Sequence, residues 1–306
     1  MTLPKNPNVL SLFDGISCAN VALKKLNIQP ANYFASEIDK FAIKCAQANH
    51  SEIIQLGNVE GVGKELLSEY NIDLLIGGSP CQSFSFAGKQ LNFDDPRGKL
   101  FFQFVRILKE IKPTYFLLEN VKMKKEYENI ISYHLGVEAI EINSNLLSAQ
   151  TRKRLYWTNI PNVKQPKDKN IKLTDILEPR EKFNNSINLN RCGRRARRFD
   201  ENGVQKSSKN FPLYKFYEVT DVNKMHTITK NERESMVTPL PAGKYEINEE
   251  NKKLLSTLTP TECEKLQTLP EGYTSNLSKS KRRDKLGDAF TVDVISHILS
   301  NVKLSN

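Results

Sequence analysis

A cysteine that follows a short apolar run is the strongest candidate for chemistry in this sequence. Residues 73–76 predict a buried strand, and the run stops at Gly77 and Gly78, where the backbone is free to turn sharply. Pro80 then fixes the backbone just before Cys81. Because open α/β sheets bind ligands at the carboxyl ends of their strands, Cys81 is a candidate nucleophile. This stretch alone supports a small buried thiol equally well.

One acid and two arginines are candidates to lie near Cys81. Residues 115–118 predict a parallel strand that ends at Glu119, on the same sheet edge as Cys81. In residues 150–157, Arg152 and Arg154 are two positions apart, so a strand would project both from one face. These groups indicate an active site. A buried ion pair is the alternative interpretation of Glu119 and the arginines.

The first strand, turn and helix predict a cradle for a nucleotide-type cofactor. A strand over residues 8–12 runs into a turn at Gly15, and a helix follows over residues 19–26. The sequence G-x-G-x-x-G is absent, which argues against a dinucleotide site and a dehydrogenase. Glu37 ends the second strand, residues 33–36, where an acid is placed to accept hydrogen bonds from ribose hydroxyls.

Strands and helices alternate through the first 120 residues, which predicts an α/β fold with a doubly wound, mostly parallel sheet. The polar segment at 83–99 is long for a connection in such a fold and is typical of a lid or binding loop. The other expected elements are helix 39–49, strand 53–55, turn 57–59, a helix before residue 73, helix 100–111 and helix 291–302.

Composition excludes several classes of protein. No apolar run among the 306 residues approaches the ~20 needed to span a membrane, and residues 1–8 lack the apolar core of a signal peptide. Five scattered cysteines without C-x-x-C spacing support neither a disulfide framework nor a metal site. We therefore expect a soluble protein of the cytoplasm without a metal ion.

Charge is distributed unevenly along the chain. Residues 1–150 hold 15 Lys and Arg against 16 Asp and Glu, whereas the remainder holds 30 against 19. A near-neutral half joined to a basic half is typical of a protein that binds a polyanion with one part. A solvated basic face is the alternative interpretation.

Six short segments stand in a fixed order along the sequence. They are Phe13-Asp14-Gly15, Gly78-Ser79-Pro80-Cys81-Gln82, Glu119-Asn120-Val121, Gln150-Thr151-Arg152-Lys153-Arg154, Leu258-Thr259-Pro260-Thr261-Glu262 with Leu266-Gln267, and Leu286-Gly287-Asp288-Ala289-Phe290-Thr291-Val292. Together these segments resemble the ordered motifs of the DNA cytosine-C5 methyltransferases. The opening residues are particularly similar to the animal de novo methyltransferases, whereas the long central region is similar to the single-chain bacterial and phage enzymes.

The resemblance implies a Rossmann-like S-adenosylmethionine-dependent fold and a covalent mechanism. The Cys81 thiolate would add to C6 of a cytosine flipped out of the duplex, so that C5 accepts the methyl group of S-adenosylmethionine and S-adenosylhomocysteine is released. Glu119 would donate or hold a proton at N3. Arg152 and Arg154 would serve the pyrimidine O2 and orient nearby acids, and Asn120 would position the strand end.

The same resemblance assigns a cofactor site. Ser17 stands where most members have a second glycine, Asn58 replaces an aspartate that contacts the adenine amino group, and Asp288 replaces an asparagine. None of these replacements removes a group that the chemistry requires. The implied cofactor residues are Phe13, Asp14, Gly15, Ile16, Ser17, Glu37, Ile38, Asn58, Val59, Gly78, Pro80, Leu100, Asp288, Ala289 and Phe290.

We expect residues 1–161 to form the catalytic and cofactor-binding domain, 162–271 a smaller target-recognition domain, and 272–306 a segment that completes the catalytic domain. Residues 279–283 predict a second phosphate-binding patch. The residues expected to contact DNA are Gln82, Ser83, Ser85, Arg97, Arg191, Arg194, Arg195, Arg197 and Arg198.

The sequence thus predicts a sequence-specific methyltransferase that acts on double-stranded DNA as a monomer in a bacterial or phage-infected cell, associated with the nucleoid. A cognate restriction endonuclease is a candidate partner, and no membrane partner is expected. The nearest alternative is an RNA (tRNA) cytosine-C5 methyltransferase, although the Cys-Phe-Thr tripeptide of that branch is absent. A catalytically silent DNA-binding homologue is the second alternative.

Overall fold

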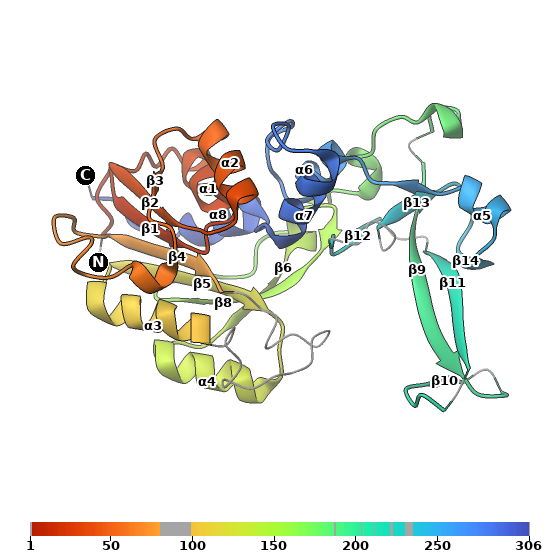
Figure 1. The fold of residues 1–306 in the computed structure, drawn as a ribbon, viewed down its shortest axis with the longest axis horizontal. Helices are drawn as coiled ribbons and strands as arrows, with labels where there is room; N and C mark the ends of the chain where they lie inside the picture. The colour runs from red at the N-terminus through yellow and green to blue at the C-terminus, as the bar shows by residue number, and fades with distance from the viewer. Residues whose placement is uncertain are drawn as a thin grey trace.

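The computed structural model describes residues 2–79, 99–186, 188–202, 204–210, 212–220, 223–229 and 235–305. These residues form a large sheet with helices on both faces and a smaller sheet at one end (Figure 1). The candidate nucleophile, the predicted lid and several predicted contacts lie outside the described residues, namely Pro80, Cys81, Gln82, Ser83, Ser85 and Arg97.

The large sheet has the strand order β3-β2-β1-β4-β5-β8-β6. The pairs from β3 through β5 are parallel, and β8 and β6 join antiparallel. The order reverses between β1 and β4, which is where doubly wound sheets bind their ligands. The strands are β1 (Asn8–Leu12), β2 (Asn32–Ser36), β3 (Ile54–Gln55), β4 (Leu74–Gly78), β5 (Tyr115–Val121), β6 (Ile140–Asn143) and β8 (Lys153–Thr158).

Apolar side chains alternate between the two buried faces of this sheet. Val9 belongs to the core on one face, and its neighbour Leu10 belongs to the core on the other. Figure 1 shows α1 (Cys18–Lys25), α2 (Lys40–Asn49) and α8 (Val292–Leu299) over the first face, and α3 (Lys99–Ile111) and α4 (Lys125–Leu135) over the second. Burial of both faces explains why the central strands read as continuous apolar runs.

The segment between β3 and β4 corrects one prediction. The helix expected before residue 73 is absent from this fully described segment, which instead holds a 3₁₀ turn at Val59–Gly61 followed by irregular turns. Gly61 and Gly63 interrupt the segment, and glycine costs about 1 kcal/mol in a helix relative to alanine. Asn58 caps the short turn, because its side-chain oxygen accepts the Glu60 backbone N–H at 3.1 Å.

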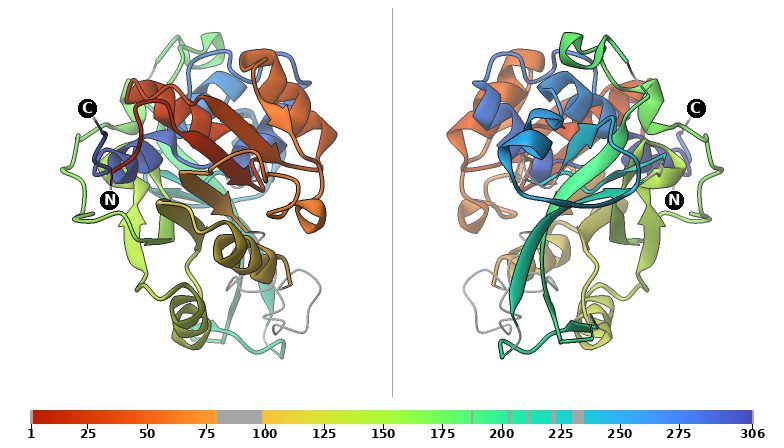
Figure 2. Two further views of the ribbon diagram at one scale, coloured as in Figure 1. Left: turned by 90° about the vertical axis from the view of Figure 1, so that its left-hand side faces the viewer. Right: turned by 90° about the vertical axis from the view of Figure 1, so that its right-hand side faces the viewer.

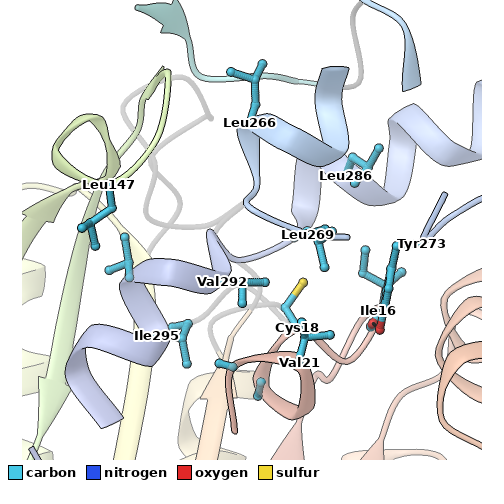
Figure 3. Close-up of a cluster of buried hydrophobic side chains, with 14 of the residues drawn as sticks. Ile16, Cys18, Val21, Leu147, Leu266, Leu269, Tyr273, Leu286, Val292 and Ile295 are labelled. Carbon is cyan, nitrogen blue, oxygen red and sulfur yellow. Dashed lines mark hydrogen bonds between the residues drawn. The ribbon is translucent and has the colours of Figure 1, made fainter. Parts of the chain in front are cut away.

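The C-terminal segment returns to the large sheet through α6 (Pro260–Leu266), α7 (Lys279–Asp288) and α8. In Figure 3, Cys18 and Val21 of α1 lie beside Val292 and Ile295 of α8. Leu266 and Leu286 bring α6 and α7 into the same core. The chain ends are also joined, because Leu3 pairs with Leu304.

The smaller sheet has the order β14-β11-β9-β13-β15, with β10 beside β9. Figure 2 (right) shows the long hairpin of β9 and β11 in front of the large sheet. The proposed limits of the recognition domain, 162 and 271, stay a prediction. The strands are β9 (Asn190–Phe199), β10 (Gln205–Lys206), β11 (Leu213–Thr220), β13 (Met236–Thr238), β14 (Gly243–Glu246) and β15 (Ser256–Thr257), and α5 (Glu249–Lys253) lies between the last two.

A separate two-stranded ladder links the two sheets. It consists of β7 (Gln150–Thr151) and β12 (Met225–His226), which pair in parallel. The side chain of Gln150 accepts the Ile228 backbone N–H at 2.8 Å and donates to the Leu266 carbonyl at 3.1 Å. The strand that leads to Arg152 is therefore held from both the recognition side and the C-terminal side.

Candidate active site

A cavity of about 600 Å³ lies at the carboxyl ends of β1, β2, β4 and β5. Its wall contains five acidic and three basic residues, so the cavity favours a cationic ligand. The lining residues are Phe13, Asp14, Gly15, Ile16, Cys18, Glu37, Ile38, Asp39, Ala42, Gly78, Ser79, Glu119, Val121, Arg152, Arg154, Lys285, Gly287, Asp288, Ala289 and Phe290.

The turn after β1 adopts a conformation that few side chains tolerate. Phe13, Gly15 and Ser17 have φ angles of 56°, 59° and 59°, in the left-handed region. A Cβ atom at Gly15 would meet nothing within 4 Å, so the backbone there borders open space. The left-handed φ of Ser17 also explains why glycine suits this position, because glycine adopts that region without steric cost.

The Asp14 side chain connects this turn to Tyr33 of β2. It is buried, accepts a hydrogen bond from Tyr33 Oη at 2.7 Å and lies against the Ser17 hydroxyl. Burial raises the pKa of Asp14 to about 6. The predicted cofactor turn therefore rests on a buried carboxyl group whose charge is costly to keep.

Glu37 joins the first and second crossover loops. One carboxylate oxygen accepts the Gly15 backbone N–H at 2.8 Å, and the other accepts those of Ile38 and Asp39 at 2.7 and 2.8 Å. These bonds hold the carboxylate at the cavity wall with a fixed orientation. Oε2, which accepts only the Gly15 N–H, keeps a second lone pair with which it can accept a hydrogen bond from a ligand hydroxyl.

Gly78 and Phe290 meet at the cavity wall. A Cβ atom on Gly78 would lie 2.6 Å from Phe290 Cε1 and 3.4 Å from Glu119 Oε2. Any larger residue at position 78 would therefore displace the Phe290 ring, whereas the Glu119 carboxylate would be in ordinary van der Waals contact. The contact brings the C-terminal motif directly against the end of β4.

Glu119 and Arg154 form a mostly buried ion pair on adjacent antiparallel strands. Arg154 Nε lies 3.0 Å from Glu119 Oε1, and the two side chains are 14% and 11% exposed. Asn120 points elsewhere, because its side chain donates to Ser79 Oγ at 3.0 Å and accepts the Val121 backbone N–H at 2.8 Å. Asn120 thus ties the end of β5 to the residue after β4.

Arg152 reaches the same cavity from the break between β7 and β8. Its Nη2 donates to the carbonyls of Gly287 and Ala289 at 3.2 and 3.0 Å. Its Nε and Nη1 are buried without a hydrogen-bond partner among the described residues. Burial, and then the charge of Arg154, lowers the pKa of Arg152 to about 10, so the group keeps its proton at neutral pH. The two unpartnered nitrogens favour a ligand that supplies acceptors.

Lys285 and Asp39 are site residues that the sequence prediction missed. Lys285 Nζ lies 2.7 Å from Asp39 Oδ2, although the two residues are 246 positions apart. Asp39 also caps α2 by accepting the backbone N–H groups of Phe41 and Ala42. No local sequence pattern marks this pair. Asp39 is only the first residue of the predicted helix 39–49, and its partner is distant in the sequence.

Gln267 supports the closing motif from behind. It is fully buried, and its side chain donates to the carbonyls of Leu286 and Ala289 at 2.8 and 3.2 Å and accepts the Thr291 hydroxyl at 2.9 Å. The glutamine of the L-Q motif therefore holds the residues that carry Phe290. This role is one of positioning, because Gln267 does not line the cavity.

The second phosphate patch predicted at residues 279–283 is partly wrong. Arg282 pairs with the fully buried Glu264 at 2.9 Å, and Arg283 is only 4% exposed. Both are inward-facing because α7 packs against α6 at this point. Two of the four cations in that run consequently serve the fold.

Several predicted site residues lie away from the cavity. Among the described residues, Ser17, Asn58, Val59, Leu100 and Asn120 do not line it. Val59 is buried in the core beneath α3, and Leu100 packs against that core. The five arginines of residues 191–198 lie on β9 of the smaller sheet, and their contacts with DNA stay a prediction.

A family model for C-5 cytosine-specific DNA methylases matches residues 7–304. The chain belongs to this family. Membership confirms the predicted resemblance, and the sheet order of the chain confirms the predicted fold class.

Individual relatives agree with the family. The chain is 41% identical over 161 residues to the orphan methyltransferase M.Rho11sI of Bacillus phage rho11s. The matched residues are 48% of this chain and 32% of that protein. The chain spans about a third of the length of the phage relatives that it matches. The type II methyltransferase M.NlaX of Neisseria lactamica is 29% identical over 314 residues, 96% of each chain.

The fold of this methylase is also similar to a solved structure. The methyltransferase EhMeth of Entamoeba histolytica superposes with a TM-score of 0.72 at 18% identity, over 97% of this chain and 98% of that one. No helix in the described part of the chain is long and apolar enough to cross a membrane. Over the same ranges, no three His, Cys, Asp or Glu side chains cluster as metal ligands would.

Proposed function

We propose that this methylase transfers a methyl group from S-adenosylmethionine to C5 of cytosine in double-stranded DNA. The observation that carries the proposal is the acidic cavity at the sheet's switch point, with an ion-paired carboxylate and an arginine with unpartnered nitrogens in its wall. The proposal rests also on the family of the chain.

The residues of the cavity fit the cofactor in shape and charge. When bound, S-adenosylmethionine supplies an activated methyl group on a cationic sulfonium. Gly15 lets a ligand approach the backbone, and Glu37 offers one fixed oxygen, Oε2, to a ribose hydroxyl. The excess of acidic residues in the wall favours the positive charge of the sulfonium.

Cys81 is the proposed nucleophile and lies outside the described residues. Cys18 is the described cysteine that lines the cavity. Burial raises the pKa of the Cys18 thiol far above its ordinary value, and burial raises that of Cys45 to about 12 and that of Cys192 to about 11. These three thiols stay protonated and are poor nucleophiles, which favours Cys81.

Glu119 and Arg152 are the groups proposed to hold the cytosine ring. Arg154 fixes one oxygen of Glu119, and the other oxygen lies beside Gly78 at the cavity wall, where it could hold a proton at the pyrimidine N3. The unpartnered nitrogens of Arg152 are proposed to donate to the pyrimidine O2. Both contacts would stabilise the charge that develops when the Cys81 sulfur adds to C6.

Covalent trapping tests this mechanism. We expect the protein with S-adenosylmethionine to form a stable adduct with duplex DNA that carries 5-fluorocytosine, because fluorine at C5 prevents the final elimination. Cys81→Ser should form none, and Cys45→Ser, the matched control at a buried cysteine that does not line the cavity, should retain the adduct. An adduct that persists in Cys81→Ser would refute the nucleophile. Trapping on a fluorinated RNA but not on DNA would favour the RNA methyltransferase alternative.

A further inference from the structure

The five arginines of β9 fall on two different faces of the smaller sheet. Cross-strand pairs place Arg195 opposite Phe216, and Arg194 opposite Tyr217. Side chains of opposite residues share a face, and neighbours along a strand alternate. We call the face of Arg191, Arg195 and Arg197 the arginine face. Arg194 and Arg198 belong to the other face.

The other face is occupied by a small apolar core. Cys192, Tyr217 and Val219 pack there with Met236 and Leu255. That face is therefore covered along part of its length by the protein itself. On the arginine face, Arg195 and Arg197 lie opposite the aromatic residues Phe216 and Tyr214. Near Arg191 this face is covered as well, because Val237, opposite Arg191, is fully buried in the main core.

A single carboxylate organises two of the guanidinium groups. Glu218 Oε2 lies 3.2 Å from Arg195 Nε and 2.8 Å from Arg197 Nη2. The two arginine side chains remain 25% and 30% exposed. Since one negative charge faces two positive charges, the cluster keeps a net positive charge and a fixed orientation. Preorganised guanidinium groups of this kind suit phosphate oxygens and the O6 and N7 atoms of guanine.

Arg191 has a different environment. Its Nε donates to Thr220 Oγ1 at 2.7 Å and its Nη1 to the Lys224 carbonyl at 3.0 Å. It therefore fastens β12 to the sheet, and we assign it a positioning role.

Aromatic rings extend the arginine face toward the tip of the hairpin. Arg197 lies 5.8 Å from the ring centre of Phe216, and Lys244 lies 5.2 Å from that of Phe199. Phe216 is buried beneath these two cations, whereas Phe199 is partly exposed. The Phe199 ring therefore provides a packing surface for a sugar or base next to the phosphate contacts.

The arginine face adjoins β7, the strand that leads to Arg152. Arg195 Nη2 lies 2.8 Å from His226 Nε2, and His226 pairs with Thr151 across the β12–β7 ladder. Burial, and then the charges of Arg191 and Arg195, lowers the pKa of His226 to about 4, so the neutral ring accepts the arginine N–H. The residue after Thr151 is Arg152 of the cavity.

We propose that Arg195 and Arg197, held by Glu218, contact the DNA duplex whose cytosine enters the cavity, and that Arg194 and Arg198 do not. This inference rests on the proposed function and names the part of the recognition region that binds. It replaces the prediction that all five arginines bind DNA with an assignment by face.

Two variants with equal charge and opposite placement test the assignment. We expect Arg195→Gln/Arg197→Gln to reduce the slope of log K against log salt for duplex DNA by roughly 2, because about 0.9 counterions are released per phosphate contact. Arg194→Gln/Arg198→Gln, on the same strand, should leave the slope unchanged. Equal losses in both variants, or a loss in the second alone, would overturn the assignment.

A lysine variant keeps the test decisive if the glutamine variant fails to fold. Arg195→Lys/Arg197→Lys retains the charge, so we expect an unchanged salt slope but at least a tenfold loss of preference for the methylated site, because lysine lacks the planar fork. Undiminished preference would contradict the inference. If the wild type methylates DNA but the two glutamine variants lose equal amounts of salt slope, this inference fails and the proposed function stands. Binding losses on RNA but not on DNA would contradict the choice of DNA.

Discussion

At the scale of single residues, the cavity depends on positions where one extra atom changes the arrangement. Gly78 has no space for a side chain because a Cβ atom there would lie only 2.6 Å from the Phe290 ring. Arg152 is placed by two carbonyls of the same C-terminal motif. Residues at opposite ends of the chain therefore define the geometry of one site.

Replacement of Gly78 tests this closure. We expect Gly78→Ala to weaken S-adenosylmethionine binding at least tenfold, because the new methyl group would displace Phe290 and the motif that carries it. Isothermal titration calorimetry measures the change. Gly61→Ala is the control, since a Cβ at Gly61 meets nothing within 4 Å. Equal affinities in wild type and Gly78→Ala would show that the motif does not close the cavity.

Asp14 predicts a pH dependence of stability. Its pKa of about 6 exceeds the ordinary 3.8, so between these values the folded protein holds a proton that the unfolded chain releases. The free energy of unfolding therefore falls as pH rises through this window. We expect Asp14→Asn to remove this loss, so that its stability relative to wild type rises by about 1–3 kcal/mol between pH 4 and 7.

Urea denaturation across pH measures this difference. Asp293→Asn is the control with the opposite sign, because hydrogen bonds from Lys25 and Lys169 lower the pKa of Asp293 despite its burial. Its stability relative to wild type should rise as pH falls through the range in which carboxylates titrate. If the stability of Asp14→Asn relative to wild type did not change between pH 4 and 7, the raised pKa of the buried Asp14 carboxyl group would be contradicted.

At the scale of elements, the L-T-x-x-E motif is explained by helix capping. Thr259 is the N-cap of α6, Pro260 takes the first helical position, and Glu262 completes a capping box. Arg180 pairs with Glu262 at 2.6 Å, which fixes the same helix end to the preceding segment. The motif thus fixes the start of the helix whose end presents Gln267 to the closing motif.

Loss of the cap should be measurable. We expect Thr259→Ala to lower the free energy of unfolding by about 1–2 kcal/mol, because its hydroxyl accepts the Glu262 N–H and donates to Glu178 at 2.6 Å. Thr261→Ala, two positions along the same helix, is the control and should cost less than about 0.5 kcal/mol. Equal costs in urea denaturation would show that the cap does not stabilise α6.

Elements with strong local signals were predictable. Strands β1 to β5 of the large sheet, and the helices α1, α2 and α3, follow from apolar periodicity and from glycine turns. The edge strand β6 was not predicted. The segment after β3 was not predictable as turns, because its apolar residues resemble a short amphipathic helix and the two glycines act through backbone entropy. The Asp39–Lys285 pair could not be predicted, since it depends on how α7 packs against α2.

At the scale of the whole molecule, the sheet that borders the cavity and the sheet that carries the arginines of β9 are joined by the β7–β12 ladder. The order of family motifs predicted the first sheet and the candidate site residues, of which many gather around one cavity. It did not predict which arginines of β9 share a face, because strand register depends on pairing with β11 and on the small core behind it. The site roles themselves stay predictions that require measurement.

The central claim is that this methylase modifies C5 of cytosine in DNA through Cys81. Bisulfite sequencing of duplex DNA incubated with the purified protein and S-adenosylmethionine tests it most directly. We predict protected cytosines in one recurring sequence context with the wild type, none with Cys81→Ser, and a reduction of at least a hundredfold in rate with Glu119→Gln. Unprotected DNA with the wild type, or unchanged protection with Cys81→Ser, would contradict the account.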